Sequence, residues 1–440
     1  KALAMCARIG LALHDAAALD DVERAVAAWS ALLEVPAWQR AAHAALVNLA
    51  IVESRLALDD LGGLEHAAER LAHAERLLAD EPALEPEADG ALIRVKLATA
   101  RGNLELRREQ FAAAAQQFAV ADTLLGSHRL AELHPDLRAH QLLGAGTAAL
   151  KQGGRKRALE LFTAARAAVA AAGDRFPSDA DLQRTRAAVH LQLGVLRLLQ
   201  RRHADAIADL EVARTTWEAL LARTAAPPVR DEVALAVSCT QLGNCYMLQQ
   251  PPQSEPARQL YTRALAIQQR LLETHPGVAA HVTELAATHS DLAAWENTFG
   301  EPAAARRHAR AAIELQERAR AERPDLPRIT QSLAIHNAQL AYAERRLGDG
   351  EAALAAARRA IELDPTHAAT VRICAEVAVA IAAGLGEPDA TDRLHGECVG
   401  WLRGLTLGTA SGIGHLLARR SFDPLRQRAD FRELVREVGR

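Results

Sequence analysis

The chain has 440 residues and a formal net charge of −3. This balance leaves no cationic field of the kind that a nucleic-acid binder or a polybasic membrane-surface protein carries, so we expect neither nucleic acid nor membrane as a partner. Half of the residues are apolar but only 3% are aromatic, because the apolar residues are mostly Ala and Leu. Such a composition favours helices over sheet.

Cysteine usage and hydropathy bear on the compartment. Five cysteines without CxxC spacing describe neither a disulfide scaffold nor a zinc site, and they fit a reducing environment. No run approaches the roughly 18 uncharged apolar residues of a bilayer-spanning helix, and the first residues lack the layout of a signal peptide. We expect a cytoplasmic protein. The chain begins with Lys, so it can be part of a longer polypeptide, including one tethered to a membrane elsewhere.

The first predicted element is a degenerate helical unit in residues 1–44, centred on 22–33. A repeat follows and continues over 45–385. The segments 261–276, 308–324 and 356–365 align with an Ala at the same position, and equivalent alanines upstream lie 44 to 51 residues apart. This recurrence predicts about seven helical hairpins. The anchor residues are Ala74, Ala121, Ala165, Ala213, Ala264, Ala312 and Ala360.

Each copy combines small residues with one larger residue. A small residue in the first helix, such as Gly194, allows the second helix to approach closely, and a second small residue, such as Ala206, marks the point where the second helix crosses back. A larger residue four positions later, such as Leu210, fills the remaining space. We expect these side chains to form the buried contact of each hairpin.

Turn residues set the limits of the helices. Gly and Pro at 299–302 and 347–350 separate first from second helices, while 272–277, 322–325 and 363–365 end second helices. After residue 384 the repeat stops. Residues 387–405 predict one more helix, 406–414 a Gly/Thr/Ser linker, and 415–438 a short helix, a turn at 422–424 and an amphipathic helix. Because the open end of a repeat array exposes an apolar face, 386–440 is expected to cap it.

The spacing of Leu-Gly/Ala, Ala, Phe/Tyr/Leu and Ala over 45–385 resembles that of the tetratricopeptide repeat (TPR) family. The resemblance implies an all-α fold, a right-handed α-solenoid of TPR-like hairpins with a C-terminal capping segment. The period of 48 exceeds the roughly 34 residues of the family. The family's aromatic residue after the small residue is present as Tyr246 but is Arg197, Glu296 and Glu344 elsewhere, so we expect some hairpins to pack less tightly.

No stretch of the sequence carries a known catalytic signature. Phosphate-binding, metalloprotease, hydrolase and protein-kinase motifs are all missing. The glycines of 408–414 have the wrong spacing for a nucleotide loop and are interpreted as a linker. His395 and Glu397 form half of a zinc-deaminase signature, but no cysteine follows Cys398 to complete it. We therefore expect no cofactor, no metal site and no enzyme activity in this chain.

Binding is the remaining class of function. In the TPR family the first helix of each pair lines a groove, with inward positions flanking the small residue. A carboxylate clamp of the chaperone-binding type is not expected, because only Asn244 matches it and no Lys stands at these positions. Exposed polar side chains without a dedicated ligand are an equally open interpretation. The candidate partner-binding residues are Gln141, Thr240, Asn244, Ser290, Asn297, Tyr342 and Arg345.

A second resemblance narrows the family. Residues 264–293 and 300–327 are similar to long-period repeats that follow the catalytic domain of bacterial, planctomycete-type serine/threonine protein kinases, and 421–438 resembles their closing DPLR-x-R-x-DF-x-x-L pattern. It implies a protein-protein interaction scaffold that binds a peptide or helix of a partner, as the non-catalytic regulatory or docking region of such a signalling kinase. The alternatives are a stand-alone TPR scaffold and, less favoured, an enzyme whose site uses Glu296, His289 and Tyr342.

Overall fold

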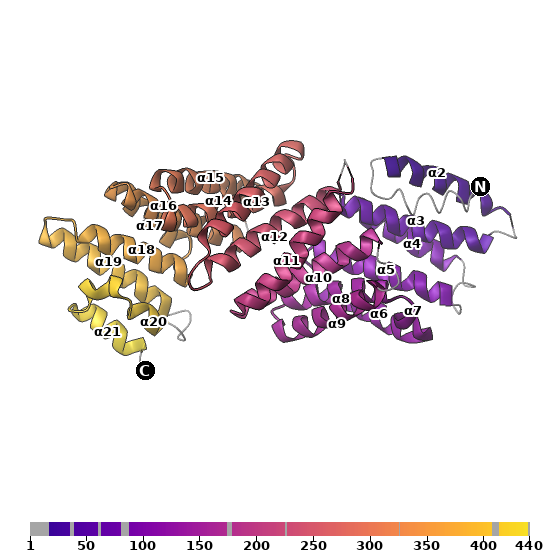
Figure 1. Ribbon diagram of the computed structural model, residues 1–440, viewed down its shortest axis with the longest axis horizontal. Coiled ribbons are helices and arrows are strands. Elements are labelled where there is room, and N and C mark those ends of the chain that lie inside the picture. The colour runs from indigo at the N-terminus through magenta and orange to yellow at the C-terminus, as the bar shows by residue number, and fades with distance from the viewer. Residues whose placement is uncertain are drawn as a thin grey trace. The chain divides into compact units, whose positions relative to one another are not determined.

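The computed structural model describes residues 17–35, 39–59, 63–80, 88–173, 178–224, 227–324, 326–406 and 413–438. Within these ranges the regular secondary structure is entirely helical, as Figure 1 shows. The chain divides into two compact units, residues 1–252 and 253–440. The fold is an all-α, TPR-like helical-repeat solenoid, which confirms the predicted fold class.

Unit 1 consists of antiparallel helical hairpins. The consecutive pairs α3 and α4, α5 and α6, α8 and α9, and α10 and α11 pack against each other, as the repeat predicts. The 3-10 turn η2 (Ser127–Arg129) and the short α7 (Leu130–Leu133) are inserted after α6. The main helices are α2 (Ala17–Leu32), α3 (Gln39–Asp59), α4 (Leu64–Ala79), α5 (Ala88–Arg107), α6 (Phe111–Gly126), α8 (Pro135–Lys151), α9 (Arg155–Gly173), α10 (Ala180–Leu199), α11 (His203–Leu221) and α12 (Val229–Met247).

Unit 2 continues the hairpin repeat and ends in helices that do not follow it. The pairs α14 and α15, and α16 and α17, are hairpins of the repeat, and α18 packs on α19. Pro stands at the first turn of α15 and of α16, where its missing N–H costs no hydrogen bond. The helices are α13 (Ser254–Thr274), α14 (Ala279–Phe299), α15 (Pro302–Glu322), α16 (Pro327–Arg346), α17 (Gly350–Leu363), α18 (Ala368–Ala382), α19 (Pro388–Thr406), α20 (Ile413–Leu417), the 3-10 helix η3 (Arg420–Leu425) and α21 (Ala429–Val438).

The division between the units falls in the fifth predicted helix pair, after Pro252, which separates α12 from α13. The predicted domain boundaries at residues 44 and 385 stay predictions. Of the predicted N-terminal unit 1–44, the structure describes α2 and the first residues of α3. Of the predicted linker 406–414, residues 407–412 lie outside the described ranges.

The repeat anchors form the interior of both units. All seven anchor alanines have 0% exposed surface. The small residues seven positions earlier, among them Ala158 and Ala206, are equally buried, and so are the larger residues between them, Phe162 and Leu210. The sequence pattern therefore marks the contact surfaces within each hairpin.

Phe118 of α6 shows how small and large residues fit together. Its ring fills the space left by two glycines, Gly102 of α5 and Gly144 of α8. A Cβ atom at Gly144 would lie 2.2 Å from the ring, and one at Gly102 would lie 2.7 Å from it. In the hairpin of α10 and α11 Leu210 meets Gly194 in the same way, at 2.6 Å. Since real Cβ atoms do not approach this closely, glycine is required where the large side chain crosses.

Two of the hairpins that lack the family's aromatic residue carry an ion pair between helices at that position. At that position Arg197 of α10 forms an ion pair with Asp209 of α11, a residue that is only 4% exposed. Glu344 of α16 is 1% exposed and accepts a hydrogen bond of 2.8 Å from Arg310 of α15. At these two positions ion pairs between helices therefore stand where the family has its aromatic residue, and the expectation of looser packing stays a prediction.

The last residues cover the end of the repeat. Phe422 and Leu425 of η3, together with Phe431 and Leu434 of α21, are at most 1% exposed. They belong to one apolar cluster with residues of α18 and α19. The predicted turn at 422–424 is part of η3, and the predicted final amphipathic helix is α21. This segment, residues 413–438, is called the cap below.

The glycine contact predicts a specific loss of stability. Gly144→Ala should lower the free energy of unfolding by about 1–3 kcal/mol, because the added methyl group collides with the Phe118 ring. Gly126→Ala is the matched control. Gly126 has an ordinary helical φ of −69° and no atom near the position of a Cβ, so this change should leave stability unchanged or raise it slightly. Urea unfolding of both variants makes the comparison, and equal stability of the two would contradict this packing.

Candidate binding pocket

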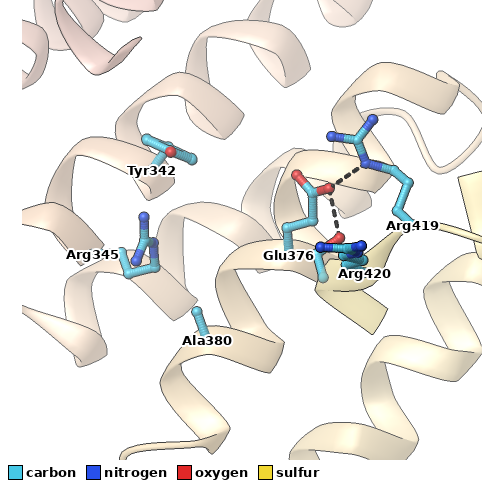
Figure 2. A pocket seen from close by; sticks show the side chains of 7 residues that line it. Tyr342, Arg345, Glu376, Ala380, Arg419 and Arg420 are labelled. Atoms are coloured by element: carbon cyan, nitrogen blue, oxygen red, sulfur yellow. Dashed lines mark hydrogen bonds and ion pairs between the residues drawn. The ribbon is translucent and has the colours of Figure 1, made fainter. Parts of the chain in front are cut away.

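One pocket of unit 2 collects residues from two first helices and from the cap (Figure 2). Its volume is about 430 Å³. Tyr342 and Arg345 are three residues apart on α16, and Glu376 and Ala380 are four apart on α18, so each pair shares one face of its helix. The remaining wall comes from the chain at the start of η3. The lining residues are Tyr342, Arg345, Glu376, Ala380, Arg419, Arg420 and Ser421.

Arg345 is held by the aromatic ring of its neighbour. Its guanidinium carbon lies 4.8 Å from the centre of the Tyr342 ring. A cation over an aromatic face is attracted by the ring quadrupole, and the flat contact restricts the rotation of the long side chain. Both residues are half-buried, so they present a fixed polar surface to the pocket.

Glu376 joins α18 to the cap. Its Oε1 accepts hydrogen bonds from Arg419 Nε at 2.8 Å and from Ser421 Oγ at 2.9 Å, both drawn in Figure 2. Its Oε2 accepts a hydrogen bond of 2.6 Å from Arg372 one turn earlier. Both carboxylate oxygens are thus engaged, and the cap residues around Arg419 are fixed relative to α18.

The structure brings two of the seven candidate partner-binding residues, Tyr342 and Arg345, into this pocket. Gln141 lines a separate groove of unit 1, formed with Phe118 and alanines of α6, α8 and α9. It is 2% exposed, and its Nε2 donates a hydrogen bond of 3.0 Å to the Phe118 carbonyl. Its amide therefore helps to hold α8 against α6.

Three further candidates are buried, and one is partly exposed. Thr240 donates to the Ala236 carbonyl at 3.1 Å within its own helix, and Asn297 donates to the Gln339 carbonyl of α16 at 3.0 Å. Ser290 is 7% exposed. Asn244 is half-buried. The side chains of Thr240 and Asn297 thus donate hydrogen bonds to backbone carbonyls. The partner-binding role of all seven residues stays a prediction.

Sequence reasoning missed the cap residues Arg419, Arg420 and Ser421, and also Glu376. The repeat pattern could have indicated Glu376, because α18 begins another pair after the last anchor. No pattern indicates the cap residues, since they reach the pocket from outside the repeat.

The three residues considered for an enzymatic site have different surroundings. Tyr342 lines the pocket described above. His289 Nδ1 lies 2.9 Å from His308 Nδ1 of α15. Glu296 Oε2 accepts a hydrogen bond of 2.8 Å from the Glu301 backbone N–H at the start of α15. These two contacts lie within the α14–α15 hairpin, and Arg346 of α16 also donates a hydrogen bond of 2.8 Å to the Glu296 backbone carbonyl.

The cysteines and the partial deaminase motif have structural surroundings. Cys239, Cys245, Cys374 and Cys398 are buried and unbridged, and burial raises the pKa of the Cys398 thiol to about 12. Glu397 receives two hydrogen bonds from Arg358, at 2.8 and 2.9 Å. Across the described ranges, no group of three or more His, Cys, Asp and Glu residues is arranged to hold a metal ion. In the same ranges, no helix has the length and apolar character to cross a bilayer.

The buried histidines of unit 2 predict a pH dependence of stability. Burial, with a smaller effect of His289, lowers the pKa of His336 to about 4, and its side chain is 3% exposed. In the folded chain this residue stays neutral down to about pH 4, whereas in the unfolded chain it binds a proton below about pH 6.5. Stability should therefore fall as the pH decreases from 6.5 to 4, by up to about 1.4 kcal/mol per pH unit for this group.

His336→Leu should make that decrease shallower, because one proton-binding difference is removed. His415→Leu, at an exposed position of α20, is the control and should keep the slope of the parent protein. Urea unfolding at pH 7, 6 and 5 measures both slopes, and identical slopes for the two variants would refute the burial of a neutral imidazole at position 336.

Among known proteins, the chain is similar only to solved structures, and this similarity is one of fold. No protein-family model matches the chain, and no curated protein matches it. The apo form of RapI aligns with a TM-score of 0.52 and 12% identity, over 89% of this chain and 96% of that chain. The apo form of the quorum sensor NprR from B. thuringiensis also gives 0.52, with 13% identity, over 87% of this chain and 97% of that chain. At these identities the likeness defines a TPR-like helical-repeat fold.

Proposed function

We propose that the protein is an interaction scaffold and that it binds a peptide or helix of a protein partner at the pocket of unit 2. The main observation is that Tyr342 and Arg345 line one pocket together. The position of both residues in the repeat predicts that they face the groove. The TPR-like fold supports this role, since stacked hairpins present side chains from successive first helices along one surface. NprR, which has the same type of fold, is named as a quorum sensor.

The size of the pocket limits what enters it. A volume of about 430 Å³ lies in the range of small-ligand sites and accommodates a side chain or a chain end rather than a whole helix. The remainder of a bound segment would lie on the neighbouring surface. A partner peptide therefore needs one residue that fits between Tyr342, Ala380 and the cap.

Filling the pocket should abolish this binding. Ala380 is exposed and lines the pocket, so Ala380→Trp places an indole in the pocket without disturbing the core. Ala355→Trp is the matched control, at an exposed position of α17 that does not line the pocket. Peptides selected by the parent chain from a soluble random nonapeptide library provide the probe. Fluorescence anisotropy should show at least about tenfold weaker binding to Ala380→Trp and unchanged binding to Ala355→Trp.

Two results would overturn the proposal. One is a library from which no peptide binds the parent chain. The other is a set of peptides that bind the parent chain and Ala380→Trp equally well, which would place binding elsewhere.

We further propose that the scaffold is the regulatory or docking region of a bacterial serine/threonine protein kinase. The support is the similarity of 264–293 and 300–327 to the repeats that follow such kinases, and of 421–438 to their closing segment. Four residues of that closing pattern have structural contacts: Leu425 and Phe431 are buried in the cap, and Arg428 pairs with Asp430 at 2.9 Å. A kinase uses cytoplasmic ATP, so this proposal places the chain in the cytoplasm.

The kinase proposal predicts the sequence that precedes Lys1 in the encoding reading frame. A catalytic domain with its HRD and DFG motifs should be encoded upstream, and sequencing of the complete reading frame tests this. A start codon close to Lys1 with no kinase motifs would instead leave a stand-alone scaffold. The binding proposal for the unit 2 pocket does not depend on this result.

A further inference from the structure

The pocket of unit 2 carries an excess of positive charge. Three of its seven lining residues are arginines and one is a glutamate. That glutamate, Glu376, already pairs with Arg419 and with Arg372. In the part of the chain that the structure describes, Arg345 and Arg420 form no ion pair with a carboxylate. Two guanidinium groups therefore line the pocket without a negative partner.

The two unpaired arginines come from opposite walls. Arg345 belongs to α16 and rests on the Tyr342 ring at 4.8 Å. Arg420 is the first residue of η3 in the cap, and Figure 2 shows it beside Glu376 on the side of the pocket away from α16. An anion between them would be approached by two planar groups whose N–H donors match the geometry of a carboxylate.

The position of the cap wall is fixed by packing. Arg419 and Ser421 are hydrogen-bonded to Glu376 at 2.8 and 2.9 Å. The next residue, Phe422, is fully buried in the apolar cluster with α18 and α19. Arg420 lies in the chain between Arg419 and Ser421, which are both attached to Glu376, so its backbone is held at the pocket before a ligand arrives. Preorganisation of this kind reduces the entropy cost of binding.

We infer that the cap forms half of the binding site and that the pocket takes a carboxylate of a peptide partner, held between Arg345 and Arg420. This inference rests on the proposed function, since it assigns the chemistry of the ligand at the same pocket. An acidic side chain and a free C-terminus both supply the required group. The cap accordingly has two roles: it covers the apolar end of the repeat and it supplies charge to the site.

The library-selected nonapeptides test the inference. They should carry Asp, Glu or a required free C-terminus, and binding to Arg345→Gln or to Arg420→Gln should be at least about tenfold weaker, because each change removes a charge-assisted hydrogen bond. Arg393→Gln, at an exposed position of α19 outside the pocket, is the matched control and should bind like the parent chain. Thermal unfolding followed by circular dichroism verifies that all three variants are folded.

Synthetic versions of the best peptide distinguish the two sources of the carboxylate. Asp→Asn or Glu→Gln changes in the peptide should abolish binding if a side chain enters the pocket, and a C-terminal amide should do so if the chain end enters. Either result supports the inference. Peptides that lose affinity for Ala380→Trp but keep it for Arg345→Gln and Arg420→Gln would overturn the inference and leave the proposed function standing. Peptides unaffected by Ala380→Trp would overturn both.

Discussion

The close approach of paired helices is the constraint on which the rest of the fold depends. Where helices cross, the side chain on one helix is reduced to a methyl group or a hydrogen, so that one large side chain from the other helix fits beneath it. Phe118 between Gly102 and Gly144 is the clearest case, since a Cβ at either glycine would enter the ring. The same geometry explains why all seven anchor alanines have no exposed surface. Interiors of this density accept little change in volume.

This constraint is also the reason that so much of the fold could be predicted. Residue size recurs in the sequence because each hairpin solves the same packing problem, so an alignment of alanines identifies the helices, their order and their buried faces. The turns at 299–302 and 347–350 are accurate to within a residue of the observed helix ends. The spacing of small residues does not show how charged residues take the position of the family's aromatic residue. Arg197 and Glu344 reach carboxylate or guanidinium partners on an adjacent helix, and a pairing between helices is not visible in the spacing of one position.

The candidate site was only partly predictable, for a related reason. A helical register assigns a residue to a face but not to a depth, and first helices of successive hairpins contact one another as well as facing outward. Gln141 and Asn297 therefore lie on the expected helices, yet their amides are engaged with backbone carbonyls of neighbouring helices. Tyr342 and Arg345 lie near the end of the array, where the repeat stops. There the inward positions stay accessible, and they line a pocket.

The location of that pocket follows from the ending of the repeat. Within an array each hairpin meets a neighbour of the same shape, and a groove there, such as that of Gln141, is lined by residues of the repeat alone. The last first helix, α18, meets the cap instead. The contact between Glu376 and Arg419 spans 43 residues of sequence, and it brings a 3-10 segment of different geometry against a helix that would otherwise face another hairpin. The pocket lies at this junction, and the residues that attach the cap to α18, Glu376, Arg419 and Ser421, form part of its walls. Where this repeat ends in its cap, the chain thus forms a pocket whose walls combine two helices of the repeat with residues from outside it.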